Sequence, residues 1–169
     1  MRKQKGFSLI ELLIVVAIIL IIAAIAIPNL LRARIAANES SAAASVRTIA
    51  TGELTYQTAY QDYSPDLASL GPPAATGCGT SPTSSAACII DYQLATAASA
   101  ATAKSGYFFG AASTAGSLQY LVTATPATQG SSGVKGFCAS EDNVVRFINP
   151  AAGAIANRAA CLALNAIGN

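Results

Sequence analysis

Few side chains in this sequence of 169 residues can take part in acid–base, nucleophilic or metal chemistry. Histidine, the commonest general base and the commonest protein ligand of transition metals, does not occur. Two features stand out: one acid, Glu11, inside an apolar run, and four cysteines further along the chain. No nucleophile stands in a pattern with a base. The sequence therefore predicts a protein with no catalytic residues, no metal site and no cofactor.

Glu11 lies in an apolar run, 7–27, that only Ser8 also interrupts. A carboxylate near the centre of a bilayer costs about 2.5–3.5 kcal/mol, and less near its edge. The run holds no lysine or arginine that could pair with it. If the chain were cut after Gly6, the new amine of Phe7 would stand one helical turn from Glu11 and could pair with it in the same chain or in a neighbouring copy. A glutamate that only reaches lipid headgroups is the alternative.

Four cysteines allow three disulfide pairings. The pairing with the shortest loops joins Cys78 to Cys88 and Cys138 to Cys161, and we predict this one. The spacings match no zinc pattern. Each closed loop would stabilise the fold by about 3 kcal/mol. Disulfides persist in oxidising compartments, so this part of the chain is expected outside the cytoplasm.

The apolar run has the length of a membrane-spanning helix, because residues 7–27 extend roughly 31 Å at the rise of an α-helix. The basic residues Arg2, Lys3 and Lys5 precede it and place the N-terminus in the cytoplasm. A buried core helix and a cleaved secretory signal are the alternatives; the run is longer than a signal's apolar stretch and has no small-residue cleavage site after it. The net charge of +2 does not predict a nucleic-acid partner.

The helical pattern continues beyond the apolar run, so Pro28 predicts a kink and not a helix end. Apolar residues recur at helical spacing at Leu31, Ile35, Ala42, Val46, Ile49, Tyr56 and Tyr60. This stripe predicts an amphipathic helix that packs against the C-terminal part of the same chain. Charged residues fall between these positions, and we expect them either to be solvated or to pair with a neighbouring subunit: Arg32, Arg34, Glu39 and Glu53.

The C-terminal part reads as loops and strands. A loop is expected over Ala74–Ala87 and a hairpin turn over Ser140–Asn143. The strands predicted from β-branched and aromatic residues are Ile89–Leu94, Tyr107–Ala111, Leu118–Thr125 and Val144–Ile148, with a short one near Ala154–Asn157. The fold class is therefore α+β, with a long N-terminal helix packed on a four-stranded antiparallel sheet.

The segment from Lys5 to Ile18, KGFSLIELLIVVAI, continuing to Pro28, resembles the N-terminus of type IV pilins and pseudopilins. The likeness extends to about residue 35. It implies cleavage after Gly6 by a prepilin peptidase and N-methylation of Phe7. It also implies that Glu11 pairs with the Phe7 amine of an adjacent subunit, and it implies the same fold of a long helix on an antiparallel sheet. Many members carry glycine within the span, where this chain has Leu20, so any local unwinding would depend on Pro28.

The resemblance divides the chain into a leader (1–6), an apolar helix (7–28), an amphipathic helix half (29–61) and a head (62–169) with both disulfides. It implies the structural subunit of a type IV pilus, a helical homo-oligomer that serves motility, adhesion or DNA uptake. Assembly would need an inner-membrane platform with a separate ATPase. The precursor would span the inner membrane, and the processed chain would lie in an extracellular filament. The alternatives are a type II secretion pseudopilin and a singly anchored extracytoplasmic binding protein.

Overall fold

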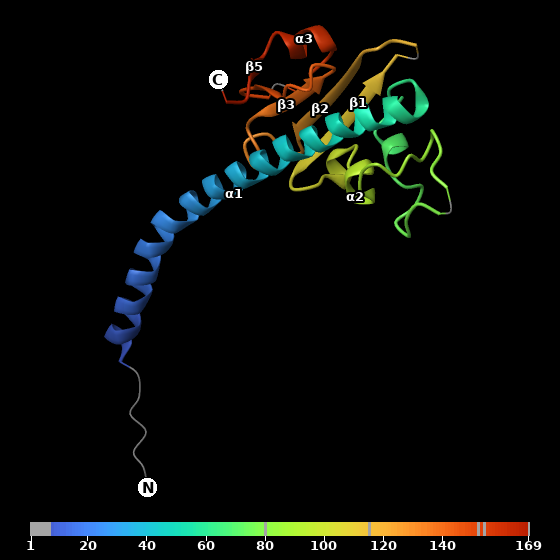
Figure 1. The fold of residues 1–169 in the computed structure, drawn as a ribbon. Coiled ribbons are helices and arrows are strands. Elements are labelled where there is room, and N and C mark those ends of the chain that lie inside the picture. Colours follow the sequence, from blue (N-terminus) through green and yellow to red (C-terminus); the bar gives the residue numbers. More distant parts are fainter. Residues whose placement is uncertain (1–7, 80, 115, 152, 154, 169) are drawn as a thin grey trace. The chain divides into compact units, whose positions relative to one another are not determined.

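The computed structural model describes all residues except 1–7, 80, 115, 152, 154 and 169. The chain divides into two compact units, residues 1–34 and 35–169. The helix α1 (Leu9–Tyr60) supplies the described part of the first unit and the first element of the second (Figure 1). Pro28 lies inside α1, so the helix does not end at Ile27.

In the first unit, α1 carries apolar side chains on all sides. None of its described residues is buried, and the segment is long and apolar enough to cross a membrane. Because the side chains are apolar around the whole circumference, no face is reserved for packing against the head of the same chain.

In the second unit, one face of α1 is buried. Its buried residues are Ala42, Ala43, Ser45, Val46, Ile49, Ala50, Gly52, Glu53 and Tyr56. Many of them are small, which lets the helix backbone lie close to the rest of the unit. At Gly52 an added Cβ would come within 3.3 Å of the Ile89 and Ile90 side chains, so glycine is what permits this approach. The predicted stripe therefore packs against the same chain from Ala42 to Tyr56, whereas Leu31, its first predicted member, is 48% exposed.

The sheet is antiparallel and follows the order of the sequence. Its strands are β1 (Tyr107–Ser113), β2 (Tyr120–Pro126), β3 (Gly136–Ser140), β4 (Arg146–Ile148) and β5 (Asn165–Ala166). Alternate residues of β1 point into the core, beginning with Tyr107 and Phe109. The predicted α+β fold, a long helix on an antiparallel sheet, is confirmed. The sheet has five strands, however, where four were expected.

The strand count differs because two strands give weak local signals. β3 is buried along its whole length and contacts the helix α3 (Arg158–Leu162), so it lacks the alternation of a half-buried strand. β5 has only two residues, and its place is set by pairing with β4. Both strands depend on contacts between distant parts of the chain.

Two predicted strands are wrong. Within Ile89–Leu94 the helix α2 (Tyr92–Ala95) begins, because the Asp91 side chain accepts the N–H of Leu94 at 2.9 Å and caps it. The described residues of the range 154–157 form no strand either. There Asn157 caps α3 by accepting the N–H of Ala160. In both places a capping side chain outweighs the β-branched residues that suggested a strand.

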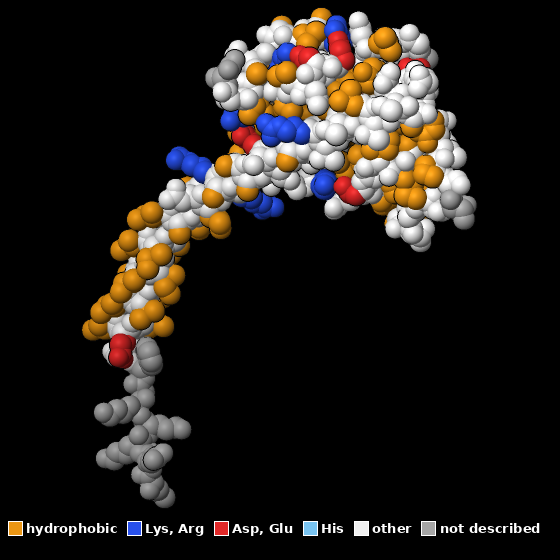
Figure 2. Space-filling model, viewed as in Figure 1, with side chains coloured by type: hydrophobic (Ala, Val, Ile, Leu, Met, Phe, Trp, Pro, Cys, Tyr) orange, Lys and Arg blue, Asp and Glu red, His pale blue; other side chains and the backbone are white. Residues whose placement is uncertain are grey.

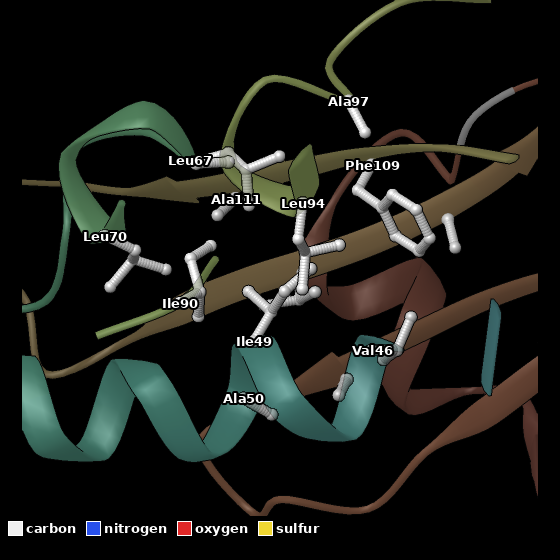
Figure 3. Packing of buried hydrophobic residues seen from close by; sticks show 14 of the residues in the cluster. Val46, Ile49, Ala50, Leu67, Leu70, Ile90, Leu94, Ala97, Phe109 and Ala111 are labelled. Carbon is white, nitrogen blue, oxygen red and sulfur yellow. The ribbon is translucent and has the colours of Figure 1, made fainter. Parts of the chain in front are cut away.

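The core lies between α1 and the sheet. Figure 3 shows Val46, Ile49 and Ala50 of α1 close to side chains of the sheet and of the connecting segment. That segment includes two short 3₁₀ turns, η1 (Ala68–Leu70) and η2 (Ala100–Thr102), together with α2. The other residues labelled there are Leu67, Leu70, Ile90, Leu94, Ala97, Phe109 and Ala111, and all of them are buried.

Candidate functional site

The bare apolar surface of the first unit is the most unusual feature of the molecule. Figure 2 shows hydrophobic side chains gathered along this part of α1. Large apolar residues from Leu9 to Leu31 are between 45% and 75% exposed. Soluble monomers rarely expose so much contiguous apolar surface, so lipid or protein must cover it in the native setting.

Glu11 lies in the first turn of α1. Its Oε2 accepts the backbone N–H of Ser8 at 3.3 Å. The spacing Ser-x-x-Glu is that of a capping box, in which the glutamate satisfies an otherwise unpaired N–H before the first turn. The carboxylate therefore stands at the positive end of the helix dipole. Gly6 and Phe7, the predicted processing residues, lie outside the described residues.

The structure brings the four cysteines together as Cys78–Cys88 and Cys138–Cys161. These are the two short-loop pairs. The first closes a loop between η1 and α2. The second ties α3 to β3, and both of its cysteines are completely buried. The C-terminal segment is thus fixed to the sheet by a covalent bond.

Glu39 contributes to the attachment of α1 to the sheet. Its Oε1 accepts the N–H groups of Val134 and Lys135 at 3.0 and 3.1 Å, and Lys135 Nζ lies 3.4 Å from Oε2. Beside it, Asn38 donates to the carbonyl of Ser132 at 2.8 Å. The expectation that Glu39 is solvated or pairs with a neighbouring subunit is therefore wrong, because its partners are in the same chain.

Glu53 is the second acid of α1 for which that expectation is wrong. Its side chain is fully buried and accepts two bonds from Ser64, from N–H at 2.9 Å and from Oγ at 2.6 Å. Burial raises the pKa of the Glu53 carboxyl, and the two Ser64 hydrogen bonds offset part of the rise. The sequence did contain a signal for the burial of Glu53, namely its spacing. Glu53 follows Ile49 by four residues and precedes Tyr56 by three, so it lies on the same buried stripe.

Comparison with known proteins addresses the N-terminal segment. A family model described as the prokaryotic N-terminal methylation motif matches residues 1–27. The type IV wide pilus major component PilA4 of Thermus thermophilus is 47% identical over 70 residues, which are 41% of this chain and 53% of that protein. The chain is therefore similar to a type IV pilin over part of its length. The methylation motif covers Glu11 and most of the exposed apolar helix.

A second pilin relative agrees with the first. The type IV major pilin protein PilA of Myxococcus xanthus is 40% identical over 62 residues, which are 37% of this chain and 28% of that protein. The chain thus spans about half, or less, of the length of the curated pilins it matches. No solved structure matches the chain. The long helix packed on an antiparallel sheet is the fold expected for a pilin.

Proposed function

We propose that this chain is the structural subunit of a type IV pilus and polymerises through its N-terminal apolar helix into a surface filament. The observation that carries the proposal is an uncovered apolar helix that bears the methylation motif and leads into a folded head. The names of the two relatives, both major pilus components, support it. The filament would serve motility, adhesion or DNA uptake.

Processing would turn the precursor into a subunit that can polymerise. A prepilin peptidase would remove residues 1–6 by cutting after Gly6, and Phe7 would then be N-methylated. The new amine would lie beside the start of α1, where the Glu11 carboxylate already accepts a backbone N–H. Pairing of Glu11 with the Phe7 amine of an adjacent subunit would offset the desolvation of the carboxylate and fix the axial register of the two chains.

Assembly would keep the apolar surface covered throughout. Before assembly, residues 7–28 would span the inner membrane with the N-terminus in the cytoplasm. They would then leave the bilayer and pack against the same segment of other copies, with a kink at Pro28. The amphipathic helix half (29–61) and the head (62–169) would lie outside the membrane, in an oxidising environment where the disulfides of the head persist. The role is mechanical, and a membrane platform with its own ATPase would drive it.

The test is the intact mass of the chain in filaments sheared from the native cells. We expect a mass that lacks residues 1–6, gains one methyl group and loses four hydrogens to two disulfides. A processed chain found only in membrane and periplasm would support a secretion pseudopilin instead. A chain that keeps residues 1–6 would contradict the pilin proposal and support an anchored binding protein.

A further inference from the structure

In the second unit, residues 35–169, the ion pairs among the described residues leave one cationic side chain unpaired. Within the described part of residues 35–169, ion pairs join Lys104 to Asp91, Lys135 to Glu39, Arg146 to Asp142 and Arg158 to Glu141. Arg47 is the remaining arginine of this unit, its side chain is exposed, and no acidic side chain of the described residues lies within ion-pair distance of it. The exposed guanidinium of Arg47 is therefore available to a partner, whereas the other cationic side chains of this unit are in ion pairs.

Among the acids left over, Asp62 lies in a built pocket. Its Oδ1 accepts the N–H of Tyr63 at 2.9 Å and its Oδ2 accepts the N–H of Gly116 at 3.0 Å. Each oxygen keeps a free lone pair, and no cation of the described residues neutralises the charge. The carboxylate is therefore held in place and still able to accept further hydrogen bonds.

Tyrosine rings form the wall beside this carboxylate. The pocket has a volume of about 270 Å³, and its lining includes Tyr56, Tyr60, Asp62 and Tyr63. The rings of Tyr56 and Tyr60 lie 4.6 Å apart, and Tyr56 is fixed because its hydroxyl donates to the carbonyl of Ser84 at 2.7 Å. Aromatic faces next to a fixed carboxylate suit a guanidinium, which stacks on the rings while its N–H groups donate to the acid.

Arg47 and this pocket lie on opposite flanks of α1. Nine residues separate Arg47 from Tyr56, which is two and a half helical turns. Arg47 lines a groove with Phe147 of β4, next to the β5 edge of the sheet, whereas the pocket is lined by Ser113 of β1, the opposite edge strand. The arginine therefore cannot reach the pocket of its own chain.

We propose that Arg47 of one copy inserts into the Tyr56–Tyr60–Asp62 pocket of a second copy. This contact rests on the proposed function, because the second copy is a neighbouring subunit of the filament. It joins two different surfaces, so it is heterologous and can repeat from subunit to subunit without closing. With α1 parallel in the two copies, the thirteen-residue spacing of Arg47 and Tyr60 sets a displacement of about 20 Å along the helix axis. This copy is therefore a different neighbour from the adjacent subunit whose Phe7 amine would pair with Glu11, since that pairing implies a shift of about 6 Å.

The decisive experiment is a charge swap in the full chain, with sheared filament per cell as the readout. Arg47→Asp and Asp62→Arg should each lower filament yield about tenfold, and the double variant should return it to within about twofold of wild type. Asp66→Arg is the matched control, because Asp66 is exposed, lies outside the pocket and, like Asp62, accepts two hydrogen bonds that arginine would lose, here from Ser69 N–H and Oγ at 2.8 Å. It should leave the yield near wild type and should not rescue Arg47→Asp.

Asp62→Arg also removes the two hydrogen bonds that Asp62 accepts from N–H groups. A second double-mutant cycle therefore uses milder changes. Arg47→Gln and Asp62→Asn remove the charges while the asparagine keeps one acceptor oxygen. If the two groups meet, each change lowers the yield and the double change lowers it no further. Three results would each overturn the contact. They are single variants with wild-type filament yield, additive losses in the second cycle, and a charge swap that restores no filament although the head melts as in wild type. A wild-type chain that forms no filament would instead refute the proposed function itself.

Discussion

Ile19 and Ile49 lie on the same helix, yet Ile19 is 57% exposed and Ile49 is fully buried. The acids of α1 show a similar contrast. Glu11 is exposed and accepts one N–H at the helix start, while Glu53 is buried and bonded twice to Ser64. The second half of α1 holds its buried stripe and its two acids, Glu39 and Glu53, in contacts within the same chain, whereas the first half leaves its apolar side chains exposed. One helix thus combines a half that the fold buries with a half that lipid or other subunits would cover in the proposed filament.

The largest effect is expected from Glu11→Ala. It should reduce sheared filament at least tenfold, because the pairing with a neighbour's amine is lost, while membrane insertion and the melting of the head stay as in wild type. Filament yield and circular dichroism of the purified full chain in detergent measure the two effects. Unchanged assembly would favour the anchored binding protein. It would also remove the assembly role that distinguishes the first half of α1 from the second half in this comparison.

The same substitution in each half sharpens the comparison. Ile49→Ala should lower the free energy of unfolding of the head by about 2–5 kcal/mol, because it leaves a cavity in the core. Ile19→Ala, its matched control, should leave head stability within about 0.5 kcal/mol of wild type, because the Ile19 side chain is exposed. Denaturant titrations of the full chain in detergent give both values. Equal losses would show that the two halves are energetically coupled.

Next in size is the loss of the Cys138–Cys161 bond. Replacing both cysteines by serine should destabilise the head by about 3 kcal/mol, because the unfolded chain regains the freedom of a 23-residue loop. The smaller Cys78–Cys88 loop serves as the control and should cost slightly less. Unchanged stability without the Cys138–Cys161 bond would show that packing of α3 on β3 is sufficient to hold the C-terminal segment.

The smallest effect concerns Glu53 and pH. Because burial raises its pKa in the folded state, the stability from this carboxyl is fully present below its ordinary pKa of about 4.5 and is lost as pH rises through the folded value. Glu53→Gln removes this slope and can keep both bonds, with its oxygen accepting from Ser64 N–H and its amide donating to Ser64 Oγ. Head stability at neutral pH should therefore equal or slightly exceed that of wild type.

Melting curves of the full chain between pH 4 and pH 7 test this. The difference between wild type and Glu53→Gln isolates the contribution of Glu53. Asp142 has a lowered pKa beside Arg146, so its contribution is lost only at more acid pH, below its ordinary value of 3.8. A slope that persists in Glu53→Gln would assign the pH dependence to another group.

Local patterns were enough to predict several elements. The apolar run and its motif predicted the exposed first half of α1, and the helical stripe predicted the buried face with Val46 and Ile49. Strands β1 and β2 were recognisable from their own alternation. In each case the physical cause, side-chain periodicity or length, is contained in the segment itself.

Only the tertiary structure decided the rest. Glu53 became a buried acceptor because Ser64 lies across from it, and Glu39 found its donors in the segment before β3. Likewise β5 exists as a strand because β4 pairs with it. Each of these features depends on a second group elsewhere in the chain. The surroundings of an acid, which its own segment does not show, decide whether its side chain is solvated or lies in the core. The sequence determined which segments form the two halves of α1, whereas long-range contacts decided which polar groups the head could bury.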